Sequence, residues 1–151
     1  MSTTTTFEDG KLHVRRTFDE PRTAVFDAWI QASKTKEWWG CADTVHVTSE
    51  IEPKVGGNYI HAMTIKNVGV HPIKGQITAF EPPARLAYKM PGMSEGDWMQ
   101  VNVEFIEDGG TTNVHLTQWP IPDPLRDIIA AGWTASFERM ARFFAGERRA
   151  A

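Results

Sequence analysis

Apolar and polar residues alternate with a period of two in a short N-terminal segment and again over most of the middle of the chain. This alternation is typical of strands that bury one face of a sheet. Glycines and prolines interrupt it at regular intervals, as turns between antiparallel strands require. The pattern predicts a meander of about six or seven strands, at 12–18, 45–51, 59–65, 75–80, 85–90, 98–105 and 112–118.

Two short helical segments are expected between the first strand and the rest. Asp19, Glu20 and Pro21 favour a helix start, because acidic residues suit the first turn and proline tolerates its missing donor. A second helix can be capped by Ser33 and can end at Gly40. Both segments precede the longer run of alternating residues.

The last element predicted is a long helix from Leu125 to about Phe144, with Asp123 and Pro124 at its start. Its apolar residues recur at helical spacing, so one side of the helix must lie on another apolar surface. Gly146 is expected to end it. These elements predict one domain over residues 11–146, with a flexible segment at 1–10 and a short tail at 147–151.

Composition narrows the classes of function. The 151 residues are 41% hydrophobic, enough for the core of one α+β domain. The net charge of −3 is spread along the chain, so nucleic acid is not expected as a partner. The sequence has no signal peptide and no apolar run that could span a membrane, which favours a cytoplasmic protein without membrane insertion. Cys41, the single cysteine, cannot form an intrachain disulfide.

A curved sheet wrapped around the long helix need not fill its interior, so we expect an internal cavity. Alternation places His61 and Gln118 on faces that are otherwise apolar. Each needs a hydrogen-bond partner, either within the protein or on a ligand that it orients. The residues expected to line the cavity are Trp39, Tyr59, His61, Met63, Ile77, Tyr88, Met90, Met99, Val101, Gln118, Trp133, Phe137 and Met140.

Several short motifs, in this order, resemble the family named after the C-terminal domain of the activator of Hsp90 ATPase, within the START-like or Bet v 1-like superfamily. The resemblance covers about 12–144. It rests on Phe18-x-x-Pro21, Val25-Phe26-x-x-Trp29, Trp38-Trp39-Gly40, Val55-Gly56-Gly57-x-Tyr59, Gly75-x-Ile77, Pro82-Pro83-x-Arg85-Leu86-x-Tyr88, Gly110-Thr111-Thr112-x-Val114-x-Leu116-Thr117-Gln118 and Gly132-Trp133.

The resemblance implies the helix-grip fold, in which a curved antiparallel sheet surrounds a long C-terminal helix after two short helices. It also implies a cavity for lipids, polyketides or other small apolar molecules, and no agreed reaction. Hsp90 is not expected as a partner, because the separate Hsp90-binding domain of the eukaryotic co-chaperone has no counterpart here. The sequence departs from the common pattern at His61 and Gln118, so ligand chemistry does not transfer from the family.

Three functions remain open at this point. The first is binding of a small apolar or amphipathic molecule. The second is a cyclase-like or dehydratase-like reaction in the same cavity, with His61 as acid or base, because its ordinary pKa lies near neutrality. The third is a stress-related or chaperone-related role in binding other proteins. A homodimer stays open. No cofactor is expected, and the spacing of the five histidines predicts no metal site.

Overall fold

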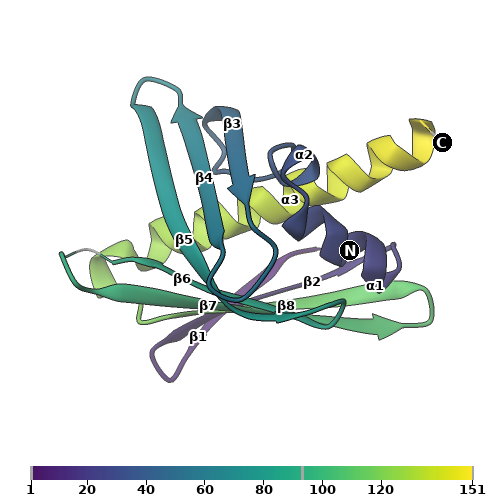
Figure 1. Cartoon of the computed structure of the whole chain (residues 1–151), viewed down its shortest axis with the longest axis horizontal. Helices are drawn as coiled ribbons and strands as arrows, with labels where there is room; N and C mark the ends of the chain where they lie inside the picture. The colour runs from purple at the N-terminus through teal and green to yellow at the C-terminus, as the bar shows by residue number, and fades with distance from the viewer. Residues whose placement is uncertain (1, 93, 151) are drawn as a thin grey trace.

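The computed structural model describes residues 2–92 and 94–150. Eight antiparallel strands form one sheet in the order β1-β2-β8-β7-β6-β5-β4-β3. Figure 1 shows the long helix α3 running across the curved sheet, with β3, β4 and β5 rising past it. The elements are β1 (Thr4–Glu8), β2 (Lys11–Phe18), α1 (Arg22–Ile30), α2 (Ala32–Thr35), β3 (Thr44–Ile51), β4 (Asn58–Ile65), β5 (Gly69–Glu81), β6 (Arg85–Pro91), β7 (Trp98–Asp108), β8 (Thr111–Trp119), a 3₁₀ turn (Asp123–Leu125) and α3 (Arg126–Ala150).

The predicted helix-grip architecture is confirmed, with one strand more than expected. The two-residue connection at Gly109 and Gly110 joins β7 to β8, and both glycines adopt positive φ, as a tight hairpin requires. The seven predicted strands correspond to β2–β8. They could be recognised because alternating apolar and polar residues indicate strands that bury one face of a sheet.

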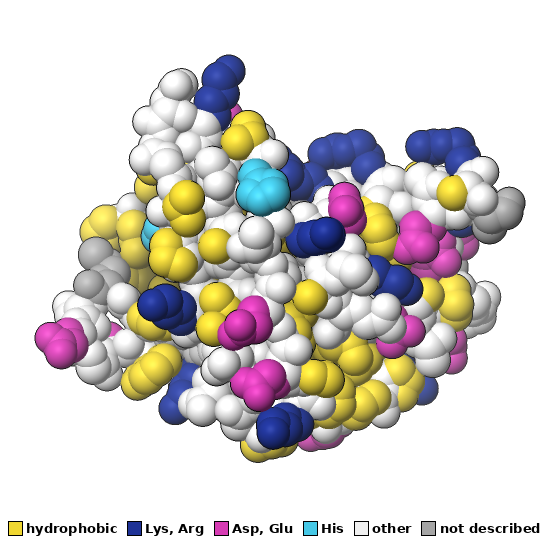
Figure 2. All heavy atoms as spheres, turned by 45° about the horizontal axis from the view of Figure 1, so that its top comes forward, with side chains coloured by type: hydrophobic (Ala, Val, Ile, Leu, Met, Phe, Trp, Pro, Cys, Tyr) yellow, Lys and Arg dark blue, Asp and Glu magenta, His cyan; other side chains and the backbone are white. Residues whose placement is uncertain are grey.

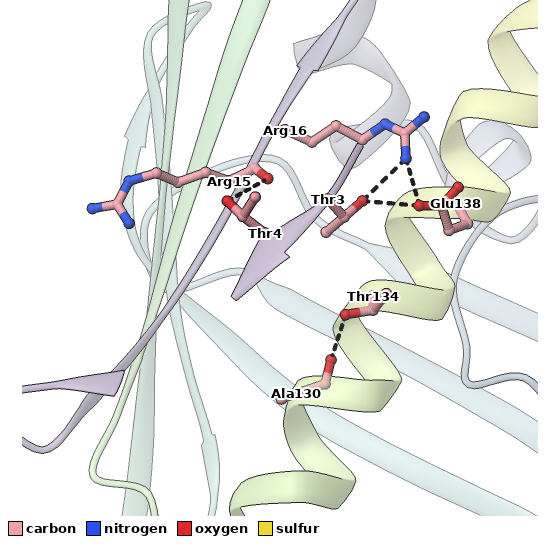
Figure 3. Close-up of polar contacts among 7 residues, drawn as sticks. All are labelled: Thr3, Thr4, Arg15, Arg16, Ala130, Thr134 and Glu138. Carbon is pink, nitrogen blue, oxygen red and sulfur yellow. Dashed lines mark hydrogen bonds and ion pairs between the residues drawn. The ribbon is translucent and has the colours of Figure 1, made fainter. Parts of the chain in front are cut away.

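The N-terminal segment was predicted to be flexible, but Thr4–Glu8 form β1, which pairs with the edge of β2. Its residues are largely exposed and polar, so no apolar alternation marks it as a strand. Figure 3 shows what holds the segment beside α3: Arg16 donates to Thr3 Oγ1 at 3.1 Å and to Glu138 Oε1 at 2.6 Å. Arg126 also lies over the ring of Phe7, 4.2 Å from its centroid.

Three other boundaries were predicted wrongly. Ser33 lies inside α2 and does not cap it, and that helix ends at Thr35 instead of Gly40. Helix α3 continues through Gly146 to Ala150, so residues 147–150 are helical and not a tail. Strand β5 begins at Gly69 and passes through Pro72, where the sequence suggested a break. The first half of β5 pairs only with β4, because its pairing with β6 begins at Gln76. Proline is tolerated at such an edge, since one side of the strand needs no donor.

A single aromatic-rich core lies between α3 and the inner face of the sheet. Helix α1 joins this core through Trp29, whose ring centroid lies 6.0 Å from that of Trp133 on α3 and 6.0 Å from that of Phe105 on β7. Ser136 on α3 donates to the carbonyl of Gly40 at 2.8 Å and accepts from its amide. These contacts hold α1, the loop between α2 and β3, and α3 on one side of the sheet.

Charged side chains lie on the outside of this core. Figure 2 shows basic and acidic groups interspersed over one face of the molecule, with no field of one sign. The buried polar residues are four threonines, one serine, one glutamine and one histidine among the residues that the structure describes. The histidine and the glutamine are the two that alternation placed inside.

Candidate ligand-binding site

His61 lies in the middle of β4 and is fully buried, on the same face as Tyr59 and Met63. Its Nδ1 atom is 2.9 Å from Ser49 Oγ, on the residue directly opposite in β3. The imidazole stacks on Trp39 with ring centroids 3.9 Å apart. Its Nε2 atom has no hydrogen-bond partner among the described residues. One end of this side chain is therefore anchored and the other is available.

Burial lowers the pKa of His61 from its ordinary value of 6.5 to about 3, because the charged form would lose its hydration. The imidazole is therefore neutral at neutral pH. A neutral ring has one N–H, so Nε2 donates if Ser49 donates to Nδ1, and accepts if Nδ1 donates to Ser49. Either role suits a hydrogen bond to a bound molecule.

Tyr59 and Tyr88 pack against each other beside His61. The Tyr59 ring centroid is 4.5 Å from that of His61 and 4.6 Å from that of Tyr88. Gly75 on β5 makes room for this arrangement, since a Cβ there would lie 3.3 Å from Tyr88 Cδ2 and 2.7 Å from the Tyr59 carbonyl. The two tyrosines and His61 thus form one buried group from β4 and β6, which we call the histidine wall.

The two tyrosine hydroxyls differ. Tyr59 donates to the backbone carbonyl of Trp29 at 2.8 Å, whereas Tyr88 has no partner among the described residues. Burial raises the pKa of both well above the usual value, and the nearby Tyr88 adds to the effect on Tyr59. Both hydroxyls therefore keep their protons at neutral pH and can donate a hydrogen bond. The indole N–H of Trp29 is a further buried donor without a described partner.

Gln118 on β8 is also buried, but its polar atoms are satisfied inside the protein. Trp133 Nε1 donates to Gln118 Oε1 at 2.7 Å, and Gln118 Nε2 lies 3.4 Å from Met99 Sδ. We call Met99, Gln118 and Trp133 the glutamine contact. The two inward polar residues meet neither each other nor a common partner, since His61 pairs with Ser49 instead.

The other predicted lining residues all lie in the same core. Trp39, Met63, Ile77, Met90, Val101, Phe137 and Met140 are buried, and Met99 packs against them half-buried. Sequence reasoning missed Ser49 and Trp29. Ser49 alternates inward with Val47 and Ile51, so its direction was readable, but its place opposite His61 depends on the strand register.

Two hollows formed by the described residues lie away from these side chains. A groove of about 530 Å³, which we call the outer groove, lies between α3 and the segment from α2 to β3 and is lined by Glu37, Ala42, Ala135, Glu138, Arg139, Arg142 and Phe143. A smaller one, of about 130 Å³, lies between β2 and the C-terminal half of α3. Neither is lined by a predicted ligand-binding residue, and aromatic side chains pack closely around His61.

A metal-binding cluster and a membrane-spanning helix are two features that residues 2–92 and 94–150 do not provide. This part of the chain brings together no group of three or more histidine, cysteine, aspartate or glutamate side chains suited to a metal ion. None of its helices has the length and apolar character needed to cross a membrane.

Comparison with known families places the chain. The model of the activator of Hsp90 ATPase homolog 1-like protein family matches residues 19–145, which is most of the sequence. The chain belongs to this family. The predicted resemblance is therefore confirmed. No curated protein matches the chain.

Solved structures of similar fold include three from bacteria. A Rhodobacter sphaeroides protein is 18% identical with a TM-score of 0.82, over 97% of this chain and 99% of that one. The AHSA1 protein of Silicibacter pomeroyi is 21% identical with a TM-score of 0.78, over 91% and 99%. CalU16 of Micromonospora echinospora is 18% identical with a TM-score of 0.72, over 97% and 86%. At these identities the likeness concerns the fold.

Proposed function

We propose that the domain binds a small, mainly apolar molecule between α3 and the histidine wall. The observation that carries the proposal is the pair of fully buried side chains, His61 and Tyr88, each of which keeps a polar atom without a partner among the described residues. An unpaired buried polar group costs about 1 to 3 kcal/mol, so a ligand that completes these hydrogen bonds gains affinity from them.

The surrounding side chains support the apolar character of the ligand. Trp39, Tyr59 and Trp133 present aromatic rings, and Met63, Met90 and Met140 are buried nearby in the same core. Methionine side chains adapt to different shapes, so a closely packed core of this kind can rearrange around a guest. Binding on this proposal requires Trp39 or α3 to shift, because aromatic rings occupy the space beside His61.

A reaction with His61 as acid or base has less support. The lowered pKa of about 3 makes the imidazole a weak base and keeps it from being a cationic acid at neutral pH. The Nδ1 atom of His61 pairs with the Ser49 hydroxyl and not with a carboxylate, which would raise the basicity of the imidazole. The same features suit a neutral group that orients a ligand.

The test is thermal unfolding followed by tryptophan fluorescence, with a panel of fatty acids, sterols and aromatic polyketides. We expect at least one compound to raise the midpoint and to bind roughly fivefold more weakly to Tyr88→Phe, since a lost hydrogen bond is worth about 1 kcal/mol. Arg142→Ala, in the outer groove, is the matched control and should leave binding unchanged. Compounds that respond to Arg142→Ala but not to Tyr88→Phe or His61→Phe would contradict the proposal.

A further inference from the structure

Among the described residues, five buried side-chain polar atoms have no hydrogen-bond partner. Two are the Nε atoms of Arg16 on β2 and Arg22 on α1, and the other three belong to uncharged core residues. Tyr88 supplies an O–H, Trp29 an N–H, and His61 its Nε2 atom. Of these three, the Trp29 indole can only donate, whereas the Tyr88 hydroxyl, which keeps its proton because its pKa is raised, can donate as well as accept. A hydrogen-bond acceptor on a ligand is therefore the group that both Trp29 and Tyr88 can meet. This inference rests on the proposed function and asks which chemistry the same site selects.

Cationic groups that could neutralise an anionic ligand lie elsewhere. Over the described part of the chain, the buried polar residues include no lysine, arginine, aspartate or glutamate. The Arg16 side chain is only 10% exposed, but it stands on β2 and is paired with Glu138 and Thr3 (Figure 3). Arg139 donates to the backbone carbonyls of Ala42 and Thr44 on the loop before β3 and the start of that strand.

The histidine itself does not supply a positive charge. The groups that face His61 are Ser49 from β3, Trp39 from the loop after α2, and Tyr59 from its own strand, and all three are uncharged. Burial opposes protonation of the imidazole in such surroundings. A carboxylate entering this site would lose its hydration and meet no opposite charge, which is costly in an apolar interior.

We propose that the site selects uncharged ligands whose polar end is a hydrogen-bond acceptor, such as a ketone, quinone or ester carbonyl, over carboxylates of the same shape. The Tyr88 hydroxyl donates to this acceptor. The aromatic and methionine side chains hold the apolar remainder. Fatty acids and aromatic acids are disfavoured as long as they are ionised.

The experiment uses matched pairs of probes, measured by isothermal titration calorimetry on the full chain near pH 8. The pairs are methyl decanoate with decanoate, and 2-acetylnaphthalene with 2-naphthoate. We expect the neutral member of a pair to bind about tenfold more tightly or better, and Tyr88→Phe to reduce that preference by weakening the neutral member about fivefold. Trp98→Phe, at an exposed position on β7, is the control and should change neither affinity.

The possible results separate the two proposals. Equal or tighter binding of the carboxylates, with Tyr88→Phe or His61→Phe still weakening binding, would overturn the selectivity and leave the proposed site standing. Tighter binding of the neutral probes without any response to Tyr88→Phe would overturn the role given to its hydroxyl. No binding of either member of any pair, together with no response to the wider panel, would overturn both proposals.

Discussion

The histidine wall and the glutamine contact are two places where a polar side chain interrupts the same apolar face. At the glutamine contact, Gln118 accepts from Trp133, and its amide nitrogen lies against Met99. At the histidine wall, Ser49 satisfies one nitrogen of His61, while the other nitrogen and the Tyr88 hydroxyl have no described partner. Burial alone therefore does not distinguish a structural polar group from a ligand-binding one. The two kinds differ in whether every polar atom of the side chain has a hydrogen-bond partner inside the protein.

The largest difference between the two regions should appear in acid, because only the histidine wall contains a group that titrates there. The folded state holds His61 neutral down to a pKa of about 3, whereas the unfolded chain protonates it near 6.5. The unfolded state thus binds more protons between these values, so stability falls as pH falls from about 6.5 toward 3. The loss from His61 alone is about 2 kcal/mol by pH 5 and about 4 kcal/mol near pH 3.

This loss is measurable as the pH dependence of the free energy of unfolding in urea. His61→Phe keeps a ring beside Trp39 and should flatten the acid slope by the amount stated above. His71→Phe, at an exposed position on β5, is the matched control and should keep the slope of the parent protein. A parent slope that His61→Phe leaves unchanged would show that burial does not hold this imidazole neutral.

At the glutamine contact, the prediction concerns stability at neutral pH. Gln118→Leu keeps most of the volume but leaves the buried indole N–H of Trp133 without its acceptor. We expect a loss of about 1 to 3 kcal/mol in the free energy of unfolding, measured by chemical denaturation. His61→Phe should cost less at neutral pH, because it removes a group that is only half satisfied.

A double variant tests the reason given for this loss. Trp133→Phe removes the donor, so adding Gln118→Leu to it should cost less than Gln118→Leu does in the parent protein. Equal costs in the two backgrounds would mean that the hydrogen bond to Trp133 contributes nothing and that the comparison of the two regions fails.

The fold could be predicted almost completely, because alternation and helical spacing record which face of each element is buried. The predictions were wrong where the sequence carries no such periodic pattern. Strand β1 is polar and depends on the free edge of β2, and the first half of β5 contains Pro72 but pairs on one side only. Helix α3 continues past Gly146 in its exposed last turns, where packing decides little.

The site could be predicted only in part, since alternation gives direction but not partners. It correctly turned His61 and Gln118 inward. The partner of His61 depends on the register between β3 and β4, which shifts between Thr44 and His46. The partner of Gln118 is Trp133 on α3, and no periodic pattern in the sequence indicates that these two residues meet. Partners from other elements require the three-dimensional structure.

The smallest expected effect separates the two tyrosines within the histidine wall. Tyr59→Phe removes the hydrogen bond to the Trp29 carbonyl and should lower the free energy of unfolding by about 1 kcal/mol, because that buried acceptor loses its donor. Tyr88→Phe removes a hydroxyl without a described partner, so stability should stay the same or rise slightly. Chemical denaturation of the two variants side by side measures the difference. A loss for Tyr88→Phe as large as that for Tyr59→Phe would mean that the Tyr88 hydroxyl is already satisfied inside the protein, and would remove it from the proposed ligand site.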